Sequence, residues 1–142
     1  TAAEYLRKLL TTQEFTDIFT FLDIPVYLLN DQPGVAPKNY TSILRSLYYS
    51  SFLQEDSSKD ILAVLSRSTY KEGIHAAIPD TIPVAHKMGV KNEYSVLSDC
   101  GIVYLPGRPY FLCIMINDKD VTNATNIISE ISRRIYTYMT KQ

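Results

Sequence analysis

The chain has 142 residues, the size of one ordinary domain, and its apolar content of 46% is enough for a packed core. Its formal net charge is −1 and its basic residues form no cluster, so we expect no nucleic-acid partner. No apolar run approaches the roughly 20 residues that a membrane helix needs, so we expect no transmembrane segment.

The first half of the chain, residues 1–72, has the apolar spacing of helices. The segment "AAEYLRKLL", residues 2–10, repeats apolar side chains at intervals of three and four. Thr11 and Glu14 have the spacing of a capping box. They predict a second helix, which Pro25 would end.

Two more helices are predicted before residue 72. The segments "APKNYTSILRSLYYSSFL" and "SSKDILAVLSRS" both carry apolar residues at helical intervals. Asp56, Ser57 or Ser58 would cap the second of them. The tetrapeptide "DQPG" at 31–34 predicts a turn.

The second half, residues 73–142, has the pattern of strands. "TIPVAHK" predicts a short strand that ends at Lys87, and "EYSVLSDCGIVYL" predicts a longer one. "PGRP" at 106–109 predicts a tight turn into "YFLCIMIN", an apolar strand that needs cover on both faces or a central position. The last segment predicts an amphipathic helix, and the fold class is therefore α+β. The apolar face of that helix would consist of Ile127, Ile128, Ile131, Ile135 and Tyr138.

Residue spacing alone singles out no catalytic or metal site. His75 and His86 lie eleven residues apart, and neither has a cysteine at metal-ligand spacing. The five glycines are scattered, so no phosphate-binding loop is predicted, and we expect no metal and no cofactor.

The segment from Ile82 to Ile116, "IPVAHKMGVKNEYSVLSDCGIVYLPGRPYFLCIMI", resembles the C-terminal half of class A β-lactamases and related penicillin-recognising serine hydrolases. In that family a strand beside the active site ends in Lys-Thr-Gly or Lys-Ser-Gly. The triplet here is Lys87-Met88-Gly89, and the next strand carries the family's Asp-x-Gly pattern at 99–101. The resemblance covers essentially the whole chain and implies part of a β-lactamase/transpeptidase-like fold. Residues 1–72 would belong to its helical subdomain, and residues 73–142 would form its C-terminal α/β portion.

The resemblance implies a role for four consecutive residues. The Lys87 cation would attract the carboxylate of a β-lactam or of a peptidoglycan peptide. Gly89 would leave room for the substrate along the strand, and the amide of Val90 would be the second oxyanion-hole donor. Met88 would take the substrate-binding position where the family has a hydroxyl, which its thioether does not replace.

A second motif of the family concerns hydrolysis of the acyl-enzyme. Class A β-lactamases carry Glu-x-x-Leu-Asn in a loop, and the closest match here runs from Val26 to Asn30. Asn30 would keep the substrate-binding asparagine, whereas Val26 would stand in place of the glutamate that activates water. An acyl-enzyme would then persist, unless the alignment slips and Asp23 or Asp31 serves instead.

Other residues near the lysine strand have open roles. The family's arginine beside the lysine is absent. His75 or Lys71 would replace it in substrate binding, or His75 would be an ordinary loop histidine. His86 is expected to point away from Lys87, because neighbours along a strand alternate faces. Cys100 and Cys113 would be cross-strand neighbours, and we expect them to be buried free thiols.

Two functions follow as expectations. One is a β-lactamase-like serine hydrolase whose nucleophile, in a Ser-x-x-Lys motif, lies in an N-terminal half outside these residues; Ser68 and Lys71 match that motif literally but stand in the wrong place. The other is a non-catalytic relative that only binds. The missing half would then be a partner, because it would cover the apolar strand 110–116, and the location would be the periplasm or cell surface.

Overall fold

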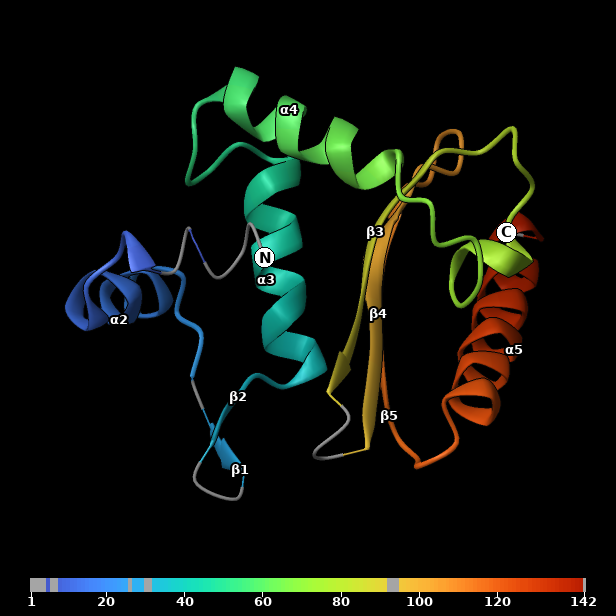
Figure 1. Cartoon of the computed structure of the whole chain (residues 1–142). Coiled ribbons are helices and arrows are strands. Elements are labelled where there is room, and N and C mark those ends of the chain that lie inside the picture. The colour runs from blue at the N-terminus through green and yellow to red at the C-terminus, as the bar shows by residue number, and fades with distance from the viewer. Residues whose placement is uncertain (1–4, 6–7, 26, 30–31, 92–94, 142) are drawn as a thin grey trace.

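The computed structural model of the chain describes residues 5, 8–25, 27–29, 32–91 and 95–141. A three-stranded antiparallel sheet in the order β3-β4-β5 forms its centre. Figure 1 shows helix α5 along one face of this sheet, while α2, α3 and α4 lie beyond the other face. The elements are α2 (Thr12–Phe21), β1 (Tyr27–Leu29), β2 (Gln32–Gly34), α3 (Pro37–Tyr48), α4 (Glu55–Ser66), the 3₁₀ turn η1 (His75–Ala77), β3 (Val84–Lys91), β4 (Val96–Val103), β5 (Tyr110–Asn117) and α5 (Val121–Thr140).

Helix α2 begins with the predicted capping box. The Glu14 backbone N–H donates to the Thr11 hydroxyl, and the Glu14 carboxylate accepts from the Thr11 backbone N–H at 2.8 Å. These two bonds satisfy amides that a helix start otherwise leaves without partners. The Thr11 backbone N–H and the Thr11 hydroxyl both donate to the Glu14 carboxylate, and these two bonds lower the pKa of Glu14 from its ordinary value because they favour the charged form. Of the helix predicted at residues 2–10, the structure describes Tyr5 and Lys8, which are helical, and Leu9 and Leu10, which lie in a turn and a bend.

Two predictions for the helical half are wrong in detail. Helix α4 begins one residue before Asp56 with Gln54 at its cap, so the three residues proposed as caps lie inside the first turn. The Gln32-Pro33-Gly34 segment is strand β2, which pairs with β1, rather than part of a turn at 31–34. Turn-forming residues can pair across a short ribbon when a neighbouring strand supplies the partners.

The β4–β5 hairpin confirms the predicted turn. The Arg108 N–H donates to the Leu105 carbonyl at 2.9 Å, and Gly107 at the third position has φ +74°. Pro106 in second place and a left-handed glycine in third place are the residues that a type II turn requires. Strand β5 is not central, but α3 and α5 cover its two faces, as its apolar sequence predicts.

Strand β3 is longer than the sequence indicates. It runs four residues past Lys87 and pairs with β4 throughout, from Val84 opposite Val103 to Lys91 opposite Val96. Lys87 therefore lies within a strand and not at its end.

The two faces of the sheet contact different helices. The α5 face holds the larger core, which includes Val84, Leu97, Leu112 and Ile128. On the other face a smaller cluster joins Leu44 of α3 to Cys100 and Ile102. The predicted apolar face of α5 is only partly correct, because Ile127 and Tyr138 are 36% and 62% exposed. The helix instead buries Ala124, Thr125, Ile128 and Ser132.

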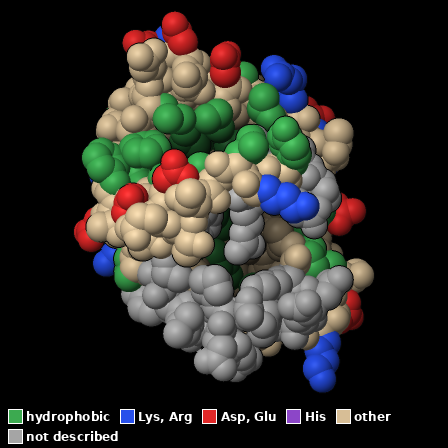
Figure 2. All heavy atoms as spheres, turned by 60° about the vertical axis from the view of Figure 1, so that its left-hand side comes forward, with side chains coloured by type: hydrophobic (Ala, Val, Ile, Leu, Met, Phe, Trp, Pro, Cys, Tyr) green, Lys and Arg blue, Asp and Glu red, His purple; other side chains and the backbone are tan. Residues whose placement is uncertain are grey.

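Large apolar side chains remain exposed on the helical part. Phe21, Tyr49 and Val64 are each at least 60% exposed, and the Phe21 and Phe52 rings contact each other in a tilted arrangement with a centroid distance of 5.1 Å. Figure 2 shows hydrophobic side chains gathered in a band on the side of the molecule that carries these helices. Among the described residues, no helix combines the length and the apolar character that crossing a membrane requires.

Replacing Gly101 with alanine should destabilise the fold more than replacing Gly107. A Cβ at residue 101 would lie 2.5 Å from the His86 Cβ and 2.6 Å from the Ala85 carbonyl oxygen, whereas a Cβ at 107 would meet no atom within 4 Å. Overpacking of this kind costs about 1–3 kcal/mol, compared with about 1–2 kcal/mol for a left-handed alanine at 107. Urea unfolding of both variants measures the difference, and equal midpoints would contradict the packing at Gly101.

Residues 1–142 expressed alone should self-associate. Among the described strands β5 pairs only with β4, so its outer edge over residues 110–116 offers a strand partner an apolar segment with no lysine or internal proline. Light scattering after size exclusion gives the mass in solution. A monodisperse monomer that unfolds cooperatively would show that this edge is covered in another way.

Candidate functional site around Lys87

Lys87 occupies the middle of an edge strand, on the face toward α3. It lies directly opposite Cys100, which in turn lies opposite Cys113, so the three side chains form one row across the sheet. The Lys87 side chain is exposed, and its ammonium donates to the Met88 carbonyl. None of the ion pairs among the described residues includes Lys87, so the cation is available to an anionic ligand.

The two cysteines are joined by a disulfide, which corrects the expectation of free thiols. Their predicted cross-strand position is confirmed, since Cys100 is directly opposite Cys113. Facing cysteines in such a pair lie close enough for a bond when the backbone groups between them are not hydrogen-bonded.

The outer edge of β3 carries backbone donors and acceptors. The Tyr104 N–H donates to the Pro83 carbonyl. This bond fixes which residues of β3 direct their backbone groups toward β4, because such residues alternate along an antiparallel pair. With the unbroken register from Val84 to Lys91, the N–H and C=O of Met88 and of Val90 point away from β4. Val90 is 42% exposed, and its N–H lies on the edge of β3 that pairs with no described strand.

Gly89 leaves this position of the strand without a side chain. Its side-chain position lies on the Lys87 face, where a Cβ would be 3.0 Å from the Ser98 hydroxyl. That hydroxyl donates to the Gly89 carbonyl at 3.3 Å. Met88, in contrast, points to the opposite face and packs, half-buried, against the core between the sheet and α5.

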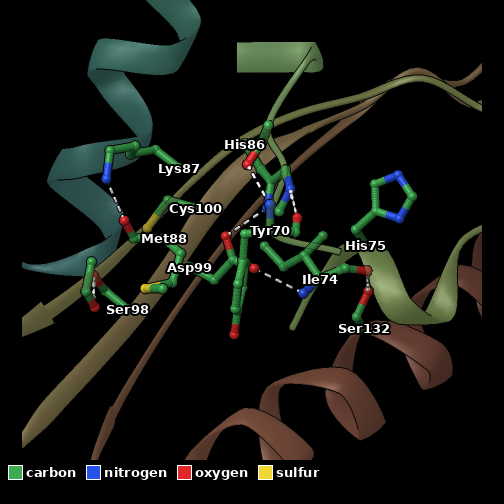
Figure 3. A network of polar contacts seen from close by, with 12 residues as sticks. Tyr70, Ile74, His75, His86, Lys87, Met88, Ser98, Asp99, Cys100 and Ser132 are labelled. Carbon is green, nitrogen blue, oxygen red and sulfur yellow. Dashed lines mark hydrogen bonds and ion pairs between the residues drawn. The ribbon is translucent and has the colours of Figure 1, made fainter. Parts of the chain in front are cut away.

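A buried polar network lies behind Lys87, on the α5 face (Figure 3). The His86 Nδ1 lies 2.9 Å from the Asp99 Oδ1, and both side chains are fully buried. The His86 Nε2–H donates to the Tyr70 carbonyl at 3.0 Å, and the Ile74 N–H donates to the Asp99 Oδ2 at 2.8 Å. The Ser132 hydroxyl of α5 donates to the Ile74 carbonyl at 2.9 Å. The predicted orientation of His86 away from Lys87 is thereby confirmed.

His75 lies apart from Lys87, at the start of η1. It is buried, and the Lys71 ammonium donates to its Nε2 at 3.1 Å. Burial lowers the pKa of His75 below its ordinary value, and the Lys71 charge lowers it further, so the ring is neutral at pH 7. Figure 3 places His75 and Lys87 on opposite sides of the network, so the structure does not bring these two residues together.

The literal Ser-x-x-Lys match does not form a site. The Ser68 hydroxyl accepts from the Tyr70 N–H, while the Lys71 ammonium contacts His75. Each side chain therefore has a different partner.

The residues of the predicted hydrolysis loop are only partly described. Val26, Asn30 and Asp31 lie outside the described residues. Asp23 follows α2 and has a φ of +51°. It is exposed and lines a pocket of about 350 Å³ together with Phe19, Thr20, Ile24, Pro25 and Asn39.

Sequence reasoning missed the buried network around His86. Tyr70, Gly73, Ile74 and Ser132 lie far from it in the chain and have no motif that marks them. One signal was present, since Asp99 is the lone charged residue of strand β4. A buried carboxylate needs hydrogen-bond donors or a cation, and a histidine on the paired strand is a natural choice. No group of three metal-binding side chains occurs among the described residues.

Comparison with known proteins identifies the family. A sequence model described as the β-lactamase enzyme family (Beta-lactamase2) matches residues 1–139. No curated protein matches the sequence.

Solved β-lactamases share the fold. The β-lactamase from Sphaerobacter thermophilus DSM 20745 superposes with a TM-score of 0.87 at 18% identity, over 98% of this chain and 57% of that one. The β-lactamase from Francisella tularensis gives 0.80 at 18% identity, over 96% and 58%. A PBP-A mutant, solved as an acyl-enzyme complex with penicillin G, gives 0.81 at 18% identity, over 92% and 52%.

The chain thus spans about half the length of these structures. The shared fold and the family match over residues 1–139 agree on one assignment. The chain belongs to the β-lactamase enzyme family.

Proposed function

We propose that this chain is part of a β-lactamase-like serine hydrolase in which β3 lines the substrate cleft. The observation that carries the proposal is Lys87, which is an exposed cation within the edge strand β3. The backbone groups of Met88 and Val90, which follow it, point outward from that edge. The nucleophilic serine would come from a part of the domain outside residues 1–142. The acyl donor would be a β-lactam or the D-alanyl end of a peptidoglycan peptide.

The chemistry divides between substrate binding and charge stabilisation. Lys87 would pair with the substrate carboxylate, and the substrate would lie along the outer edge of β3 as an added strand. When the serine oxygen attacks the carbonyl carbon, negative charge develops on the carbonyl oxygen. The outward N–H of Val90 would stabilise that charge, an effect worth about 10²–10³ in rate for one donor. The C–N bond then breaks, the nitrogen takes up a proton, and a serine ester remains.

Hydrolysis of that ester is expected to be slow. The sequence aligns Val26 with the glutamate that activates water in class A β-lactamases, and valine cannot accept a proton. A PBP-A mutant with the same fold has been solved as an acyl-enzyme with penicillin G. Asp23, which lines the pocket after α2, is the described carboxylate that would serve if the alignment slips.

A non-catalytic relative that only binds its ligand is the second candidate. It is supported by Met88, which has no hydroxyl and whose side chain packs in the core on the far side of β3 from Lys87. The adduct experiment below separates the two candidates, because a binding protein would form no covalent product.

We also propose a location outside the cytoplasm. The Cys100–Cys113 disulfide supports an oxidising compartment, where such bonds persist. The proposed substrates, which occur at the cell envelope, support the same location.

The complete domain should form a stable covalent adduct with benzylpenicillin. Intact-protein mass spectrometry should show an increase equal to the mass of one penicillin, because ring opening expels no atoms. The adduct should persist after free drug is removed, since Val26 would not activate water. Rapid release of hydrolysed penicillin would contradict slow deacylation, and the absence of any adduct would favour the binding protein.

Lys87→Ala should lower the second-order acylation rate in the complete domain by about 10- to 100-fold, the effect of losing a charge-assisted hydrogen bond of about 1.5–3 kcal/mol. Lys59→Ala is the matched control, because Lys59 is an exposed lysine of α4 whose partner is Glu55. Stopped-flow acylation with a chromogenic cephalosporin measures both. Equal acylation rates for the two variants would show that Lys87 does not contribute to the site.

A further inference from the structure

The two ring nitrogens of His86 both face oxygen atoms, and the two oxygens belong to different elements. Nε2 meets the Tyr70 carbonyl, which can only accept, so this nitrogen carries a proton. Nδ1 meets the Asp99 carboxyl group of β4, so one further proton lies in that contact. The ring is therefore held at both ends, by the neighbouring strand and by the segment that precedes η1.

Two glycines make room for this pair. His86 lies against Gly101, where a Cβ would come within 2.5 Å of the His86 Cβ. Gly73 lies on the other side, with φ +62°, and a Cβ there would come within 2.5 Å of the Asp99 Oδ2. The pair thus fills a space that both glycines leave open.

The Asp99 carboxylate is fixed from a third direction. Its Oδ2 accepts from the Ile74 N–H, and the Ile74 carbonyl accepts from the Ser132 hydroxyl of α5. Asp99, Ile74 and Ser132 are all fully buried. The anchor of His86 therefore reaches through these three buried residues, from Asp99 of β4 through Ile74 to Ser132 of α5.

We propose that the His86–Asp99 pair positions the Lys87 site. Strand β3 has a partner strand on one side only among the described residues, so its outer half lacks a second ladder to hold it. The bond from His86 to Tyr70 supplies an attachment on that side. Because His86 and Lys87 share a peptide unit, fixing the imidazole fixes the direction of the Lys87 side chain and of the outward groups of Met88 and Val90.

The proposal assigns His86 and Asp99 as positioning residues, which touch no substrate. Its consequence for acylation rests on the function proposed above. A displacement of reacting groups by about 1 Å can cost about 10²-fold in rate, so a modest shift of β3 would be measurable.

Gly73→Ala tests the proposal from outside the strand, with Gly107→Ala as its control. Both residues have a left-handed φ, so both variants carry the same kind of backbone strain, but only the Cβ at 73 would press on Asp99. In the complete domain, Gly73→Ala should acylate about tenfold more slowly per folded molecule than Gly107→Ala. The rates are measured well below each melting temperature, so that loss of folded protein does not contribute. Equal rates per folded molecule would overturn the proposal.

Asp99→Ala and Asp99→Asn give an independent test if Gly73→Ala does not fold. An asparagine amide can donate to the His86 Nδ1 and accept from the Ile74 N–H, which leaves the Nε2–H bond to Tyr70 in place. Asp99→Asn should therefore retain most of the acylation rate that Asp99→Ala loses. If the two variants acylate at equal rates per folded molecule, the side chain at residue 99 does not position β3, and the proposal fails.

A readout without any reaction separates this proposal from the proposed function. The backbone amide NMR shifts of Lys87, Met88 and Val90 should move in Gly73→Ala and Asp99→Ala and stay near wild type in Gly107→Ala and Asp99→Asn. If the wild type forms no penicillin adduct while these shifts move as described, the proposed function fails and the positioning role stands. Unchanged shifts in all four variants would overturn the positioning role, whatever the acylation result.

Discussion

The contact between His86 and Asp99 is the constraint on which the C-terminal portion of this chain depends. It lies where β3, β4, the 70–74 segment and α5 meet, and each of these elements contributes a group to it or to its supporting bonds. A buried pair of this kind is costly to break, because removal of one partner typically costs about 3–5 kcal/mol.

The same contact also selects the register of β3 on β4. Side chains alternate faces along a strand, so a slip by one residue would exchange the faces of His86 and Lys87. The slipped arrangement would bury an ammonium group against α5 and leave the Asp99 carboxylate without its ring partner. The apolar pattern opposes the same slip, because the slip would move Val84 and Met88 out of the core between the sheet and α5.

The parts of this structure that were predictable from sequence are those with local causes. The Thr11–Glu14 capping box and the Pro106-Gly107 turn each lie within four residues, so their spacing shows in the sequence. The family resemblance depended on the short triplet at Lys87, and the alternation of faces oriented His86 correctly. The length of β3 was missed because Met88 and Gly89 look like a strand end, and only pairing with β4 extends the strand through them.

The rest depended on contacts between distant residues. Asp99 is 13 residues from His86 and 25 from Ile74, and Ser132 is 58 from Ile74, so no local pattern connects them. The cysteine pair shows the same limit, since facing positions were predictable but the bond between them was not. The exposed Ile127 and Tyr138 illustrate it again, because helical spacing marks an apolar stripe without saying which part of it meets the sheet.

The cysteine bond has a consequence for the chain before it folds. Cys100 and Cys113 are separated by 13 residues, so the bond closes a short loop that contains the whole β4–β5 turn. A cross-link acts on the denatured ensemble, where it removes conformations that separate the two strands, and for a loop of about 15 residues this amounts to about 3 kcal/mol. The oxidised denatured chain would therefore already hold Cys100 opposite Cys113, and β3 would find a partly formed template to dock on. Reduced and oxidised protein would then differ more in how fast the sheet assembles than in its final shape.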